Sequence, residues 1–162
     1  MMRENMIGKT VWQLVQKNYS YTCDKDHTHL VVAIVEPKHR LPDGRENTDW
    51  CEHLILQRED GTLFDIKYYE CVVIPDMSLP LAERLAQCLK DNQVYADIWE
   101  VNEDKIVLHI DWGDWKHDHG WCNSLMGYIG YSCGDEIVTE ENGSDCYSAT
   151  HYFYRDEEDS AI

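Results

Sequence analysis

The sequence has no long hydrophobic segment and few basic side chains. No run of about 18 apolar residues occurs, and residues 1–16 hold no apolar stretch of signal-peptide length. Lys and Arg number 14 against 31 Asp and Glu, so the net charge is −17. Nucleic acid and anionic lipid surfaces repel so acidic a chain. We therefore expect a cytoplasmic protein that neither enters a membrane nor binds nucleic acid directly.

Recognisable catalytic and metal motifs are also missing. The seven cysteines are an odd number without a C-x-x-C pair, which argues against a zinc framework or a disulfide scaffold. There is no G-x-S-x-G, no glycine-rich phosphate loop and no calcium-loop spacing. We expect reduced cysteines, most of them buried as small hydrophobic side chains, and no cofactor.

The chain is nevertheless expected to fold. Its 162 residues are 43% hydrophobic, and a chain of this length buries roughly 70% of its unfolded surface. Apolar side chains at helical spacing predict three helices, over residues 8–18, 79–92 and 115–128, with Asp114 capping the last.

Alternating and β-branched residues predict the strands. One strand covers 29–36, and the Asp60-Gly61 turn joins two more at 51–59 and 62–74. Further hairpins are expected at 95–112 and 133–155. These elements indicate an α+β fold, with an antiparallel sheet built from hairpins and about three helices. The chain forms a single domain over 1–162, or two small lobes with a seam near 75–80, and residues 156–162 form a frayed acidic tail.

Charge is distributed unevenly along the chain. Residues 1–90 hold 14 acidic and 11 basic side chains, whereas residues 91–162 hold 17 acidic and 3 basic ones. Acids at alternate positions of a strand lie about 6.5 to 7 Å apart, a spacing similar to that of successive phosphates in nucleic acid. Two interpretations follow: a surface that solubilises the protein, or a surface that mimics nucleic acid. Tyrosine and tryptophan between the acids suit a protein interface.

Histidine and aspartate gather in two segments. Asp24, Asp26, His27 and His29 lie together, and the two histidines share one face of a strand. The second segment offers His109, Asp111, His117 and His119 as metal ligands. The alternative is that these side chains cap helices, form hydrogen bonds or lie on a solvated loop.

Size, acidity, aromatic content and missing catalytic motifs together resemble a class of small acidic proteins. The segment 106–154, which contains IDWGDWKHDHGW and EENGSDCYSATHYFY, looks similar to uncharacterised proteins of mobile elements. The class is the anti-CRISPR and antirestriction proteins with which phages, plasmids and conjugative elements act against host defence. This resemblance implies a non-enzymatic inhibitor in the cytoplasm of a bacterial host, bound to a Cas nuclease or a restriction enzyme.

The first hypothesis is therefore that C-terminal acids and one tryptophan bind a basic nucleic-acid-binding protein. The predicted partner-binding residues are Asp111, Asp114, Trp115, Asp118, Glu140, Glu141, Asp145, Asp156, Glu157 and Glu158. One alternative is a metal-dependent hydrolase that uses the 109–119 cluster. Another is an accessory interaction domain of a mobile element, whose acidity only keeps it in solution.

Overall fold

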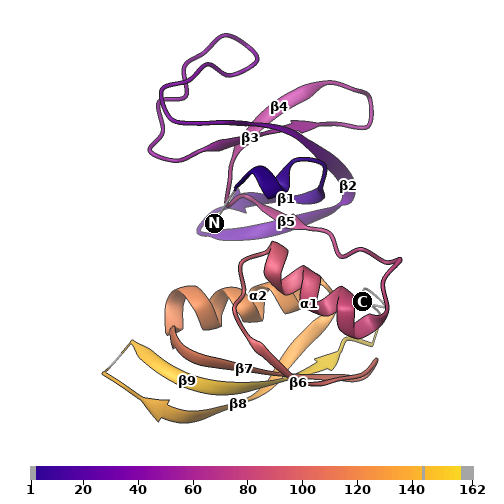
Figure 1. Ribbon diagram of the computed structural model, residues 1–162, viewed down its shortest axis with the longest axis vertical. Coiled ribbons are helices and arrows are strands. Elements are labelled where there is room, and N and C mark those ends of the chain that lie inside the picture. Colours follow the sequence, from indigo (N-terminus) through magenta and orange to yellow (C-terminus); the bar gives the residue numbers. More distant parts are fainter. Residues whose placement is uncertain (1–2, 144, 158–162) are drawn as a thin grey trace. The chain divides into compact units, whose positions relative to one another are not determined.

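The computed structural model describes residues 3–143 and 145–157 (Figure 1). The chain divides into two compact units, Met1–Ile74 and Pro75–Ile162, at a boundary that adjoins the predicted seam. Each unit has its own antiparallel sheet. The mixed α+β class and the antiparallel pairing expected from the sequence are both observed.

Unit 1 is built on a five-stranded sheet. After a short 3-10 helix, η1 (Arg3–Met6), come β1 (Thr10–Lys17), β2 (Ser20–Val35), β3 (His53–Gln57), β4 (Leu63–Lys67) and β5 (Cys71–Val73). The strand order is β4-β3-β2-β1-β5, and the long β2 pairs with both β1 and β3. The core holds buried aliphatic side chains from several of these strands, among them Val11, Val31, Leu54, Leu56 and Ile66.

The hairpin predicted around Asp60-Gly61 is confirmed, but its second strand, predicted over 62–74, divides into β4 and β5, because the chain turns at 68–70 and β5 pairs with β1. β3 and β4 pair from His53 opposite Lys67 to Gln57 opposite Leu63. Gly61 has φ +88°, a left-handed conformation that glycine adopts without steric cost. The Asp60 carboxylate accepts hydrogen bonds from the Thr62 backbone N–H and hydroxyl, which fixes the turn.

The helix predicted over residues 8–18 is wrong, because this segment is strand β1. Val11 and Leu14 are buried at a separation of three, which is typical of a helix. In β1 the same separation occurs where the pairing with β2 shifts, because Trp12 alone faces the four residues of β2 between Asp24 and His29. Such an irregularity interrupts the alternation of side chains between the two faces of the sheet, so the strand acquires helix-like burial.

Unit 2 has a four-stranded sheet with the order β6-β7-β9-β8. Its elements are α1 (Leu81–Asp91), β6 (Asp97–Val101), β7 (Lys105–Asp114), a π-helical turn η2 (Trp115–His119), α2 (Gly120–Tyr128), β8 (Tyr131–Glu141) and β9 (Cys146–Arg155). The two α-helices lie over one face of this sheet, where α1 contacts β6 and α2 contacts β8 (Figure 1). Buried Ile106, Leu108 and Phe153 contribute to the core.

Both helices predicted in unit 2 are present, and so are its two hairpins. Asp114 caps η2 as expected, with its side chain accepting from the backbone N–H groups of Lys116 and His117. Because β1 replaces the first predicted helix, the described residues contain two α-helices instead of about three.

All seven cysteines are free, and four of them are buried. Burial raises the pKa of Cys88 and of Cys122 to about 12, so both thiols stay protonated at neutral pH. Among the described residues, no helix is long and apolar enough to cross a membrane.

Candidate functional site

Most of the predicted partner-binding residues meet at one end of the unit 2 sheet. They come from the end of β7, from η2, from the end of β8 and from the β8–β9 connection: Asp111, Asp114, Trp115, Asp118, Glu140, Glu141 and Asp145. Pairing brings these segments together, because Asp114 lies opposite Cys146 and Glu141 lies opposite Tyr147. Figure 1 shows the end of β7 beside the β8–β9 connection. We refer to these seven residues as the acidic end of unit 2.

Exposed tryptophans accompany these carboxylates. Trp112 is 41% exposed and Trp115 is 53% exposed. The Trp115 backbone N–H donates to the Asp145 carbonyl oxygen at 2.9 Å, which ties η2 to the β8–β9 connection. Large aromatic surfaces next to charged groups are typical of protein interfaces.

Some carboxylates of the acidic end are fixed in place. Asp118 accepts from the Asp114 backbone N–H at 2.7 Å, and Asp111 accepts from the Ser148 hydroxyl at 3.0 Å. With the Asp114 cap, these bonds set three carboxylates in defined positions around η2. Such positioning lowers the entropy cost of binding a partner.

The last predicted acids lie elsewhere. The Asp156 backbone N–H donates to the Gly130 carbonyl oxygen at 2.8 Å, and its carboxylate accepts from the Ser132 hydroxyl. Asp156 and Glu157 follow β9, whose length of ten residues corresponds to about 30 Å. They are therefore separate from the acidic end, and Glu158, with the rest of the predicted tail from residue 158 on, lies outside the described residues.

The four predicted metal ligands do not form one group. The His109 ring stacks on Trp99 with 4.5 Å between ring centroids, and its Nδ1 lies 3.0 Å from the Thr150 hydroxyl oxygen. His117 is exposed on η2, whereas His119 is buried. Asp111 interacts with Ser148, as described above.

His119 instead meets two residues that the sequence did not suggest. Its Nδ1 lies 2.7 Å from His151 Nε2, and Glu136 Oε1 lies 3.7 Å from the same His151 nitrogen. One ligand atom from each residue lies within 4.8 Å of the others. We refer to His119, Glu136 and His151 as the histidine cluster. Glu136 and His151 are directly opposite each other on β8 and β9. Sequence reasoning predicted this hairpin but not its register, and the register is what would have identified the pair.

Tyr147 organises the surroundings of this cluster. Its ring stacks on His119 with 4.3 Å between centroids, and its hydroxyl donates to Glu136 Oε1 at 2.8 Å. Burial and the adjacent Glu136 raise the pKa of Tyr147, so the hydroxyl keeps its proton. Burial lowers the pKa of His151 to about 4, which keeps that imidazole neutral at pH 7.

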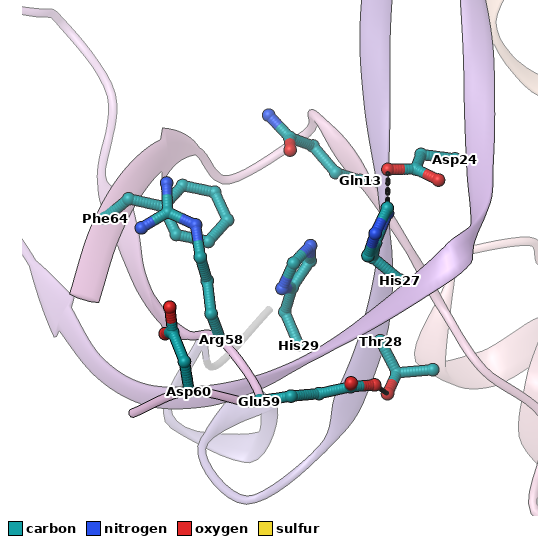
Figure 2. A pocket seen from close by; sticks show the side chains of 9 residues that line it. All are labelled: Gln13, Asp24, His27, Thr28, His29, Arg58, Glu59, Asp60 and Phe64. Atoms are coloured by element: carbon teal, nitrogen blue, oxygen red, sulfur yellow. Dashed lines mark hydrogen bonds and ion pairs between the residues drawn. The ribbon is translucent and has the colours of Figure 1, made fainter. Parts of the chain in front are cut away.

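Unit 1 contains a cleft of about 380 Å³ beside β2 (Figure 2). It is lined by Gln13, Asp24, His27, Thr28, His29, Arg58, Glu59, Asp60 and Phe64. Charged groups of both signs face it, and the Arg58 guanidinium lies 4.1 Å from the centre of the Phe64 ring.

Three of the four residues of the first predicted histidine group line this cleft, namely Asp24, His27 and His29, whereas Asp26 does not. The three have different surroundings. His27 Nδ1 is 3.1 Å from Asp24 Oδ2, and this bond holds the Asp24 pKa below its usual value. His29 is buried edge-on against Phe64, and its Nδ1 has no hydrogen-bond partner. Burial lowers the pKa of His29, and nearby Arg58 adds to this effect. The cleft is therefore a mixed polar surface.

Comparison with known proteins places the chain in no family. No family model matches it, and no curated protein or solved structure shows significant similarity. Function is therefore argued from the geometry of the acidic end and of the histidine cluster.

Proposed function

We propose that the chain is a non-enzymatic inhibitor that binds a basic nucleic-acid-processing enzyme of host defence, a Cas nuclease or a restriction enzyme. The acidic end of unit 2 enters the nucleic-acid site of that enzyme and competes with phosphates. The convergence of six carboxylates and an exposed tryptophan from two separate segments, residues 111–118 and 140–145, carries this proposal.

Charge supports a basic partner. Unit 2 has 19 acidic and 5 basic side chains, whereas unit 1 has 12 acidic and 9 basic ones. A field of one sign speeds encounter with an oppositely charged protein and disfavours partners of the same sign. The grooves of nucleic-acid-binding enzymes carry the required positive charge.

The exposure of β8 supports the same interpretation. Ten of its eleven residues are exposed, and it forms an edge of the sheet. Glu140 and Glu141 extend the acidic end along this strand. An exposed acidic strand can enter a groove that accommodates a nucleic-acid strand, while Trp115 supplies apolar contact area.

The test is target-DNA cleavage by a panel of guide-loaded Cas nucleases and restriction enzymes, with the full chain titrated in at low and high salt. We expect inhibition that saturates near one protein per enzyme and weakens at high salt, because salt screens charge pairs at the rim of an interface. Inhibition of equal strength at both salt concentrations, or none at large excess, would contradict the proposal.

A matched pair of variants locates the surface. Glu140→Lys, Glu141→Lys and Asp145→Lys together reverse three charges at the acidic end. Asp26→Lys, Glu36→Lys and Glu46→Lys reverse three exposed acids in unit 1. Both variants change the net charge equally, so loss of inhibition in the first alone assigns binding to the acidic end. Equal loss in both would show that only total charge matters.

A further inference from the structure

The histidine cluster joins three elements of unit 2 at one point. Glu136 lies on β8, His151 is its cross-strand neighbour on β9, and His119 ends η2. His119 and His151 are 1% and 0% exposed, whereas the Glu136 side chain is 31% exposed. The two imidazoles are therefore held in the interior, and the carboxylate connects them to solvent.

Hydrogen bonding fixes the tautomers in this cluster. His119 Nε2 lies 3.1 Å from the Tyr147 carbonyl oxygen, which can only accept, so Nε2 carries the proton. His119 Nδ1 therefore presents a lone pair to His151. His151 Nε2 lies 2.7 Å from it and must donate, since two lone pairs at that distance repel each other. The single proton on the axis between these nitrogens occupies a position that a cation can take.

We propose that the histidine cluster binds one divalent transition-metal ion of the zinc class, through His119 Nδ1, His151 Nε2 and a Glu136 carboxylate oxygen. Two imidazoles and one carboxylate are a donor set that suits zinc. This inference does not depend on the proposed inhibitory function.

The surroundings of His119 and Glu136 match those of known metal ligands, whereas His151 Nδ1 is buried without a hydrogen-bond partner. The far N–H of His119 donates to a backbone carbonyl, and the Tyr147 hydroxyl orients Glu136. Such outer hydrogen bonds are typical around metal ligands, because they fix ring orientation and raise ligand basicity. The partial exposure of Glu136 leaves one side open for a fourth ligand, as in zinc sites with three protein ligands.

Binding requires a small adjustment. Two nitrogens that each lie about 2.0–2.1 Å from a tetrahedral ion are about 3.3 Å apart, so the histidines must separate by about 0.6 Å. The His151 proton leaves Nε2 and the ring takes one up at Nδ1, so the imidazole stays neutral and no net proton is released. The ion replaces the hydrogen bond that now joins the two rings.

The test uses the full chain, stripped of metal by a chelator and titrated calorimetrically with Zn²⁺ in excess Mg²⁺. Excess Mg²⁺ saturates surface carboxylates that attract any cation. Imidazole ¹⁵N NMR then follows the tautomer of His151. We expect one equivalent of Zn²⁺ to bind, and the His151 proton to move from Nε2 to Nδ1.

Three variants complete the test. Glu136→Gln removes the anionic ligand but keeps an acceptor for Tyr147, and it should weaken Zn²⁺ binding by at least about tenfold. His119→Gln should weaken it similarly, and His117→Gln, two residues away and exposed, should leave it unchanged. The proposal is overturned if wild type shows no saturable binding, if Glu136→Gln binds as wild type does, or if the His151 tautomer does not change. Should His119→Gln fail to fold, Glu136→Gln still decides.

Discussion

Unit 1 places several of its 12 carboxylates beside its own Arg and His side chains, whereas the 19 acids of unit 2 share only 5 Lys and Arg side chains. In unit 1, Arg45 Nη2 lies 3.0 Å from Asp65, and His53 lies between Asp65 at 2.8 Å and Asp49 at 2.6 Å. Charge in unit 1 therefore contributes to the fold of that unit. In unit 2 the excess charge repels itself, and a basic partner can relieve this repulsion.

The largest expected effect tests whether each unit has its own core. Leu54→Ala in unit 1 and Leu108→Ala in unit 2 each remove a fully buried side chain. Each should lower the free energy of unfolding by about 2–5 kcal/mol. Amide hydrogen exchange of the full chain should show lost protection mainly in the unit that carries the substitution. Equal loss of protection in both units would mean that they unfold together.

A smaller effect is expected from His53→Ala, which removes both bonds between the buried imidazole and its aspartates. Loss of these charge-assisted bonds should lower the free energy of unfolding by about 1–3 kcal/mol, measured by chemical denaturation. His39→Ala is the control, because His39 is exposed. If the two variants were equally stable, the bonds of His53 would contribute nothing to unit 1.

Removing carboxylates should shift stability in opposite ways in the two units. The triple lysine variant at Glu140, Glu141 and Asp145 should unfold at a higher temperature than wild type in low salt, because it relieves repulsion. The gain should shrink as salt rises. Asp43→Asn should instead lower the unfolding temperature, because it weakens the interaction with Arg45. A triple variant less stable than wild type in low salt would disprove the repulsion.

The smallest expected effect is a loss of stability of unit 1 at acid pH. Hydrogen bonds lower the pKa of Asp24, Asp43 and Asp60 from the ordinary value of 3.8. Their contribution is present above that value and is lost as pH falls through the lowered values, so unit 1 should lose stability below about pH 4. Asp60→Asn keeps an acceptor for Thr62 but cannot titrate, and it should flatten the pH dependence of the free energy of unfolding. If the slope of the free energy of unfolding against pH were unchanged, Asp60 would not contribute to the acid dependence.

Local patterns predicted most of the fold. The Asp60-Gly61 turn, the alternation of Ile106, Leu108 and Ile110, and the Asp114 cap each depend on residues close in sequence. β1 could not be predicted in this way. The register shift between Val11 and Gln13 is defined by pairing with β2, and no neighbouring residue signals it.

The two candidate sites of unit 2 also differ in whether they depend on residues close in sequence or on the pairing of distant strands. The acids at the acidic end could be chosen from charge alone, because they cluster in two short segments. The histidine cluster could not be found, because the position of His151 opposite Glu136 depends on a register shift in β8 between Val138 and Glu140, which separates this pair from the turn. Its third member, His119, is brought to the pair by the packing of η2.

The open edge of β8 has one more consequence, for self-association. An exposed strand edge is a template on which another chain can add a strand, which is how sheet aggregates begin. Exposed Ile137 and Val138 would favour such growth, but Glu136 and Glu140 lie on either side of them. Two copies that paired edge to edge would bring these carboxylates within about 5 Å of their counterparts. Repulsion between these carboxylates therefore disfavours pairing of β8 with β8 of a second copy, but it does not oppose pairing with a basic strand.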